Sequence, residues 1–172
     1  MNTLWANVFR PRQDKKDTIL SILKRIPVFE KLTPKELPQI ERILHERHYR
    51  SDEPIFHQGD PGLGMYIIVE GDVGIVSEPE RHVLARLHDG EFFGELSLLD
   101  DSPRTATAIA ETPCRVLCLL QSDLYDLIDR QPRLGARILI QLARTIGERL
   151  KRTNEHVYAL KKEKEEAKAC GQ

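Results

Sequence analysis

Hydrophobic positions change their spacing twice along the chain. Up to about residue 50, apolar side chains recur every three or four positions, which places them on one face of a helix. Between about residues 51 and 120 they form short runs rich in β-branched residues, separated by turn-forming pairs such as Gly71-Asp72. From Ser122 onward the helical spacing returns. This order predicts N-terminal helices, a middle region of short strands, and C-terminal helices.

The N-terminal region predicts three helical segments. Residues 4–9 and residues 19–23 each carry an apolar helical face and are followed by a proline. The third segment starts with a capping box, in which the Thr33 hydroxyl and the Glu36 carboxylate lie three residues apart. Because Pro38 interrupts the first turn, we expect the regular helix to begin a few residues after Thr33.

The middle region predicts an all-β unit. Many short strands at regular spacing with turn residues between them are typical of a sandwich or barrel, here a jelly roll. The expected strands are Met65–Val69, Val73–Ile75, Val83–Leu87, Phe92–Phe93, Thr105–Ile109 and Val116–Leu120. The predicted fold class is therefore α+β, a jelly-roll β-barrel (double-stranded β-helix) with N-terminal helices and a long C-terminal helix.

Two helices are expected after the barrel. Ser122 is expected to cap a short helix, and Pro132 to begin a much longer one. From Leu150 on, the apolar spacing alternates between three and four residues, as in a coiled-coil seam. We predict that this helix forms a homodimer contact. The alternative is that it packs on its own barrel and ends in a solvated tail.

The three regions give the expected organisation of the chain. An N-terminal helical segment covers residues 1–25, and a barrel with flanking helices covers residues 26–130. The long C-terminal helix covers residues 131–172. The apolar face of residues 4–9 is expected to dock on the body or on a partner subunit; a membrane-surface anchor, helped by nearby basic residues, is the second interpretation.

Composition excludes several classes of protein. The 172 residues carry 26 basic and 27 acidic side chains, a net charge of −1, which gives no global field for nucleic acid. No apolar run approaches the roughly 18 residues that span a bilayer, and no secretory signal is visible. Three cysteines without metal-type spacing fit a reducing compartment, so we expect a cytoplasmic protein. They are Cys114, Cys118 and Cys170.

The stretch from Phe93 to Thr107 carries the candidate chemistry. Gly94 permits a tight turn, and the helical turn after it offers unpaired backbone amides, which bind anions. Arg104 can fold back over these amides and hold a phosphate through charge-assisted hydrogen bonds. The Glu95 carboxylate would repel a phosphate, so it is expected to accept from sugar hydroxyls. The motif predicts a nucleotide or sugar phosphate as ligand; a structural ion pair between Glu95 and Arg104 is the alternative.

This stretch resembles the phosphate-binding cassette of the cyclic nucleotide-binding domain. That domain is shared by the bacterial catabolite activator protein, by regulatory subunits of cyclic-nucleotide-dependent kinases and by cyclic-nucleotide-gated channels. The resemblance extends over about residues 25–160 and includes Ile55–Asp60 and Tyr66–Val73. It implies cyclic AMP or cyclic GMP as ligand, with no metal and no enzymatic activity.

The resemblance also implies a role for individual residues. Arg104 should pair with the cyclic phosphate, and Glu95 should accept from the ribose 2′-hydroxyl. Thr105 should touch the phosphate or a guanine amino group. Backbone approach and amides should come from Gly94, Leu96 and Ser97.

A second resemblance concerns the long helix. Arg149–Val157 is similar to the part of the catabolite activator's dimer helix that reads the adenine, with one contact from the opposite subunit. Thr153 and Asn154 stand at the matching positions, although Asn154 replaces a serine and its amide can pair with adenine or guanine. By strand register, Ile75 and Leu84 are candidates to line the base pocket.

These observations predict a receptor whose C-terminal helix closes over the bound nucleotide and signals to an effector protein of unknown identity. The alternative is a nucleotide-independent dimeric interaction module. A DNA-binding regulator is disfavoured because the residues after Val157 leave no room for a helix-turn-helix. An enzyme is disfavoured because no catalytic set of residues is found.

Histidines and cysteines outside this motif receive structural interpretations. His45 and His48 lie three residues apart on a predicted helix, and we expect them to be solvated rather than metal ligands. Cys114 and Cys118 are expected to be small buried side chains rather than a redox pair.

Overall fold

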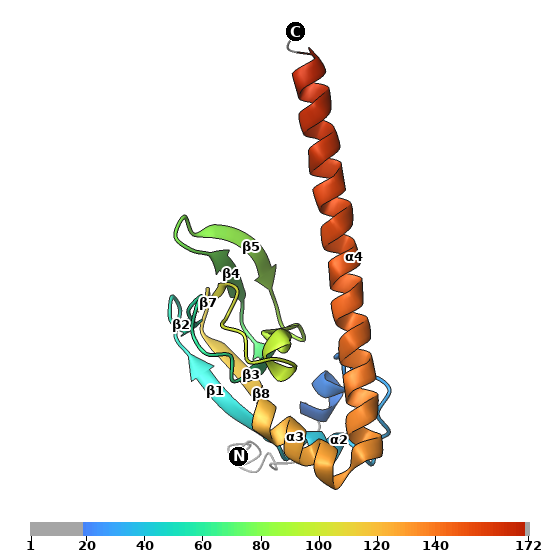
Figure 1. Cartoon of the computed structure of the whole chain (residues 1–172). Helices are drawn as coiled ribbons and strands as arrows, with labels where there is room; N and C mark the ends of the chain where they lie inside the picture. Colours follow the sequence, from blue (N-terminus) through green and yellow to red (C-terminus); the bar gives the residue numbers. More distant parts are fainter. Residues whose placement is uncertain (1–18, 171–172) are drawn as a thin grey trace, which may run out of the picture.

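The computed structural model describes residues 19–170, with side chains described for residues 19–162. Two four-stranded antiparallel sheets form the body, and a long helix leaves it (Figure 1). One sheet has the strand order β1 (Leu44–Tyr49), β8 (Cys114–Leu120), β3 (Gly64–Glu70) and β6 (Phe92–Phe93). The other has the order β2 (Pro54–Phe56), β7 (Thr107–Ala110), β4 (Val73–Ser77) and β5 (His82–Leu87). The predicted jelly-roll class is confirmed.

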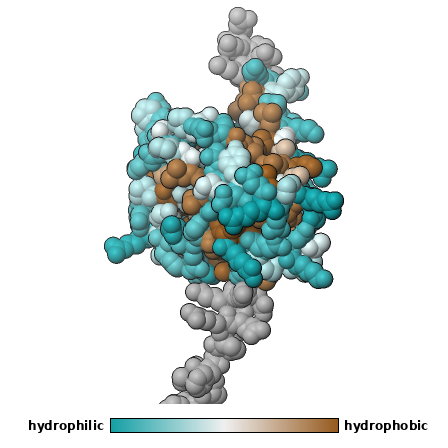
Figure 2. All heavy atoms as spheres, turned by 60° about the horizontal axis from the view of Figure 1, so that its bottom comes forward, coloured by the Kyte–Doolittle hydropathy of each residue, from teal (hydrophilic) through white to brown (hydrophobic). Residues whose placement is uncertain are grey.

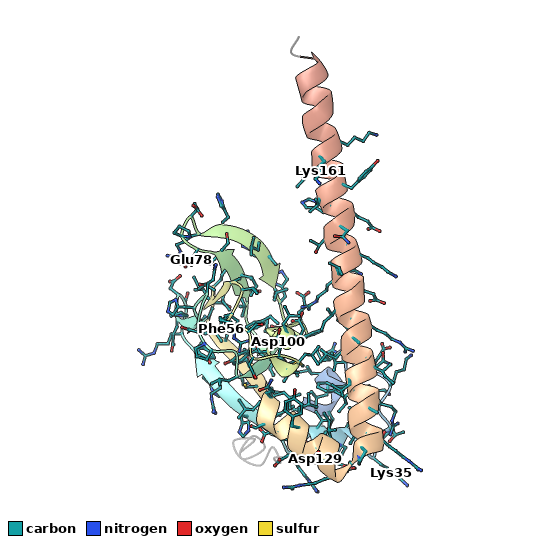
Figure 3. All side chains as sticks on the ribbon, viewed as in Figure 1. Lys35, Phe56, Glu78, Asp100, Asp129 and Lys161 are labelled. Atoms are coloured by element: carbon teal, nitrogen blue, oxygen red, sulfur yellow. The ribbon has the colours of Figure 1, made fainter. Side chains whose placement is uncertain are left out.

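Helices precede, interrupt and follow the strands. A helical turn covers residues 19–23, and the further elements are α2 (Leu37–Glu41), the 3₁₀ helix η1 (Glu95–Leu98), α3 (Gln121–Arg130) and α4 (Pro132–Cys170). In the views of Figures 1 and 3, α4 runs past the barrel and extends well beyond it. None of the helices in residues 19–170 has a stretch apolar enough to cross a membrane.

The core consists of two clusters on opposite faces of the first sheet. Along β3, Met65 and Ile67 point into the cluster shared with the helices, whereas Ile68 points into the barrel interior. The run Met65–Val69 is continuously apolar because this sheet is buried on both faces. The face of the molecule seen from the α3 end is mostly hydrophilic, with smaller apolar groups between the polar ones (Figure 2).

The start of α2 follows the sequence prediction. The Glu36 carboxylate accepts hydrogen bonds from the Thr33 backbone N–H, at 2.9 Å, and from its hydroxyl, at 2.8 Å. These bonds, the backbone one above all, lower the pKa of Glu36. The helix then begins at Leu37 with Pro38 in its first turn.

The structure corrects several of the expected elements. The chain becomes a strand at Leu44, so His45 and His48 lie on β1 and not on a helix. The prediction is wrong because pairing with β8 overrides the local pattern. The short strand β2 was not predicted, and β7 starts at Thr107, two residues later than expected. Ser122 does not cap α3, because β8 runs directly into the helix and Leu120 stands at the cap position.

The apolar stripe of α4 divides into a buried and an exposed half. Pro132 begins the helix as predicted, and Ile138 and Leu142 are fully buried in the cluster shared with the helices. Leu150 is 59% exposed, and Val157 is exposed as well. Residues 4–9, predicted to form an N-terminal helix, lie outside the described residues.

Candidate functional site

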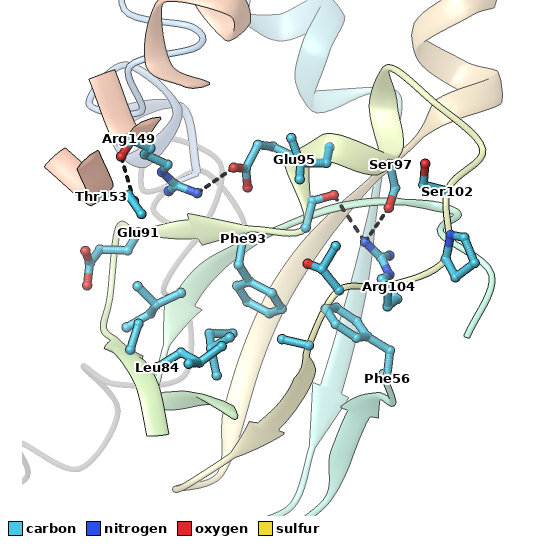
Figure 4. A pocket seen from close by; sticks show the side chains of 18 of the residues that line it. Phe56, Leu84, Glu91, Phe93, Glu95, Ser97, Ser102, Arg104, Arg149 and Thr153 are labelled. Carbon is cyan, nitrogen blue, oxygen red and sulfur yellow. Dashed lines mark hydrogen bonds and ion pairs between the residues drawn. The ribbon is translucent and has the colours of Figure 1, made fainter. Parts of the chain in front are cut away.

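A cavity of about 770 Å³ lies between η1, the β4–β5 ribbon and α4 (Figure 4). Seven of the eight predicted ligand-binding residues line it: Gly94, Glu95, Leu96, Ser97, Arg104, Thr105 and Thr153. The eighth, Asn154, is exposed on α4 and is not among the lining residues. Ile75 and Leu84, predicted from strand register, do line the cavity.

The turn into η1 depends on a glycine. Gly94 has φ +73°, in the left-handed region that non-glycine residues rarely adopt. A Cβ atom there would lie 2.6 Å from Nη1 of Arg104, so the glycine also makes room for the guanidinium. After the turn, Leu98 is fully buried in the cluster shared with the helices. This burial anchors η1 to the body.

Arg104 is the most constrained side chain of the cavity. It is only 6% exposed, and its Nη1 donates to the Gly94 carbonyl at 3.1 Å and to the Ser97 hydroxyl at 2.8 Å. Its Nη2 donates to the Gly64 carbonyl at 2.8 Å. Burial lowers the pKa of Arg104, and none of the ion pairs among the described residues includes it. Its Nε is fully buried and has no hydrogen-bond partner among the residues that the structure describes. The site therefore contains a buried cation with an unused donor.

Glu95 has a different partner from the one considered in the sequence. It is 7% exposed, and its carboxylate forms an ion pair with Arg149 of α4 at 2.8 Å. The alternative of a Glu95–Arg104 ion pair is therefore wrong. Arg149 also donates to the Phe92 carbonyl at 2.9 Å, and its guanidinium lies 4.4 Å above the centroid of the Phe92 ring. Arg149 thus joins α4 to the base of the cavity.

The far end of the cavity is formed by α4 and the β4–β5 ribbon. Thr153 donates its hydroxyl to the Arg149 carbonyl at 2.9 Å, one helical turn back. Its oxygen lone pairs are left to accept from another group. Arg152 lines the same side, opposite the apolar surface of Ile75 and Leu84. This end can hold a flat group between apolar and polar surfaces.

Some contributors to the surroundings of Arg104 and Glu95 were not assigned a role from the sequence. They include the Gly64 carbonyl, the Phe56 ring and Arg149. Of these, only Arg149 could have been assigned to the cavity from the sequence, because it precedes Thr153 by four residues and so shares its helix face. The other two are brought to Arg104 from separate strands by the barrel.

The histidines and cysteines whose side chains the structure describes form no second site. Cys114 and Cys118 are free and buried, as predicted, and burial raises the pKa of both thiols. His45 Nε2 lies 2.8 Å from the Asp123 carboxylate of α3. Among the described residues, no group of three or more histidine, cysteine or acidic side chains is placed to hold a metal ion.

The sequence is similar to known regulatory proteins. The family model for the cyclic nucleotide-binding domain matches residues 46–131, half of the chain. The cyclic AMP receptor protein of Thermus thermophilus is 35% identical over 129 residues, which cover 73% of this chain and 60% of that protein. A cAMP-dependent protein kinase regulatory subunit of Hypocrea atroviridis is 35% identical over 99 residues, covering 58% of this chain and 21% of that protein. The chain spans about three fifths and one fifth of the lengths of these relatives.

The fold is similar to solved structures as well. The N-terminal domain of a transcriptional regulator from Streptomyces coelicolor matches with a TM-score of 0.68 at 32% identity. The match covers 79% of this chain and 94% of that one. Sequence, fold and cavity agree, and the chain belongs to the family of cyclic nucleotide-binding domains.

Proposed function

We propose that this chain is a cytoplasmic cyclic AMP receptor module, with cyclic GMP as a second ligand. One observation carries the proposal: the buried Arg104, with its unused Nε donor, lines the same cavity as the buried carboxylate of Glu95. A cation and an acceptor-only group in one cavity suit a ligand that joins an anion to a hydroxyl donor. A cyclic nucleotide does so through its phosphate and its ribose 2′-hydroxyl.

Each predicted residue has a role in this proposal. The phosphate accepts from Arg104 and from the backbone amides of η1, where Gly94 lets the chain approach closely. Glu95 accepts from the ribose, and the base lies toward Thr153 and Leu84. The printed names of both relatives mention cyclic AMP, which favours that ligand. Thr105 lines the cavity and is the residue proposed to admit cyclic GMP.

The proposed output is a change in the position of α4. Its ion pair joins the proposed ribose acceptor, Glu95, to Arg149 on the helix. A nucleotide that contacts both walls of the cavity would favour the closed position of α4, which is a shift between populations. The exposed apolar positions beyond the body would pair with a second copy, placing Asn154 near the partner's cavity. An effector protein then binds the dimer, and the nucleotide is released without chemical change.

Calorimetry of the nucleotide-stripped protein tests the receptor function. We expect micromolar or tighter binding of cyclic AMP, and binding at least about 100-fold weaker in Arg104→Ala because charge-assisted hydrogen bonds are lost. Lys161→Ala at an exposed position of α4 is the matched control and should bind as the wild type does. Absence of heat, together with failure to displace a fluorescent analogue, would contradict the receptor and favour the nucleotide-independent interaction module.

Sedimentation in the analytical ultracentrifuge tests whether the chain forms the proposed homodimer. The wild type should sediment as a dimer, more completely with cyclic AMP, and Val157→Glu should weaken association because it places a charge on the exposed apolar stripe. A wild type that remains monomeric at high concentration with the nucleotide would exclude the proposed dimer while leaving nucleotide binding standing.

A further inference from the structure

The guanidinium of Arg104 is buried, and its charge has to be stabilised by its surroundings. A buried cation is stable only when neighbouring groups replace the water it has lost. The described hydrogen-bond partners of this guanidinium are two backbone carbonyls and the Ser97 hydroxyl, none of which is an anion. Burial lowers the pKa of Arg104 by more than nearby Tyr66, Cys118 and Asp60 raise it. A further interaction must therefore offset part of the free-energy cost of burying this charge.

Aromatic rings lie against the guanidinium. Its central carbon is 4.1 Å from the centroid of the Phe56 ring and 5.7 Å from that of Tyr66. We call Phe56, Tyr66 and Phe93 the aromatic platform, since their ring centroids lie 5.4 to 5.9 Å from one another. In Figure 4, Phe56 lies just below Arg104 and Phe93 lies to its left. A cation over the face of such a ring is attracted by the negative face of its π-system.

The platform remains uncharged near neutral pH. Burial raises the pKa of Tyr66 to about 12, so its phenol stays protonated. Phenylalanine has no charge to lose. An aspartate or glutamate in place of the platform would neutralise the guanidinium and compete with an incoming anion, whereas a ring holds the cation and leaves its full charge available.

We infer that Phe56 is a positioning residue for the ligand phosphate, because its ring holds the face of the Arg104 guanidinium and thereby fixes the cation in the lining of the cavity. The inference rests on the proposed function, since the phosphate is that of the proposed nucleotide. Phe56 comes from β2 and acts through Arg104. The rest of the platform supports the Phe56 ring from the barrel interior.

Fluorinated phenylalanines at position 56 test the inference. Mono-, di- and trifluorination withdraw electron density from the ring face and hardly change its shape. We expect the affinity for cyclic AMP to fall stepwise, by about tenfold across the series. Phe29 is the matched control, because it is fully buried in the cluster shared with the helices and no cation lies over its ring among the described contacts. The same series at Phe29 should leave the affinity unchanged.

Two natural substitutions provide a rescue test. Phe56→Leu should weaken binding by about tenfold because it removes the π face, and Phe56→Trp should restore most of the affinity. A readout without ligand accompanies them: the ring current of Phe56 should shift the side-chain NMR signals of Arg104 upfield, and Phe56→Leu should abolish the shift.

The outcomes separate this inference from the receptor proposal. A wild type that binds cyclic AMP, with a flat fluorination series at position 56, overturns the role of Phe56 and leaves the receptor intact. A wild type that binds no nucleotide overturns the receptor, and with it the phosphate-positioning role, even if the NMR shift shows the ring over Arg104.

Discussion

The two walls of the cavity are built differently. The barrel wall consists of η1, Arg104 and the platform beneath it, and its polar side chains are almost fully buried and interlocked by hydrogen bonds. The α4 wall carries exposed side chains at Arg152 and Thr153. Among the described residues, the polar contacts that join it to η1 and β6 come from Arg149.

This difference fits a division of the proposed receptor into a part that recognises the ligand and a part that responds to it. A wall that is buried and hydrogen-bonded holds its donors in place before a ligand arrives, which lowers the cost of ordering them on binding. A wall held by few contacts opens at a small free-energy cost. We therefore expect the barrel wall to decide which anion binds, and the α4 wall to report that it has bound.

The largest predicted effect concerns the anchoring of α4 below the cavity. Leu142→Ala should lower the free energy of unfolding by about 2–5 kcal/mol, because it leaves a cavity at a fully buried site. The matched change Leu150→Ala, about two helical turns further along α4, should change it by less than about 0.5 kcal/mol. Urea titrations at a dilution that keeps the chain monomeric measure both. Equal losses would show that the upper half of α4 is as firmly packed as the lower.

The next effect tests how tightly the barrel wall is packed. Gly94→Ala should destabilise the fold by about 1–2 kcal/mol through its left-handed backbone, and should also weaken cyclic AMP binding about tenfold by displacing Arg104. Gly90→Ala is the matched control, since Gly90 has φ +82° and open space around its Cβ position. It should cost a similar amount of stability without loss of affinity. Thermal unfolding measures the stability of both variants, and calorimetry measures their affinity for cyclic AMP. Equal affinities would contradict tight packing of the barrel wall around Arg104.

A smaller effect is expected at the junction of the two walls. Arg149→Ala should weaken cyclic AMP binding only about two- to fivefold, because the partly exposed ion pair with Glu95 is worth about 1 kcal/mol or less. Backbone amides of α4 beyond the body should exchange faster, which hydrogen exchange followed by mass spectrometry detects. Arg144→Ala, at an exposed position on the same helix, should do neither. Unchanged exchange in Arg149→Ala would mean that another contact holds the helix.

The smallest effect concerns the access of water to the barrel wall. Tyr66 has a pKa raised by burial to about 12, above the value of about 10 in an unfolded chain. Its contribution to stability is therefore complete below about pH 10 and is lost as the pH rises toward about 12. Tyr66→Phe should remove this part of the alkaline loss, measured as the difference in the free energy of unfolding between the two proteins. Parallel pH profiles would show that water reaches the platform.

Local sequence predicted much of the fold and of the cavity. The run from Gly94 to Arg104 predicted the turn, the short helix and the returning arginine, because each step depends on neighbouring residues. Pro132 marked the start of α4 for the same reason. The strands β1 and β2 were missed, since their pairing with β8 and β7 outweighs their own weak patterns.

Patterns in the sequence were sufficient to predict the jelly-roll barrel and the charged residues that line the cavity. The partners of those charges depend on the folded chain. Glu95 is paired with Arg149 across the cavity, and the Arg104 guanidinium lies over the ring of Phe56 from β2. Such pairings depend on where distant segments meet once both core clusters are packed. No local spacing of residues encodes that meeting point, because it results from the sum of many apolar contacts.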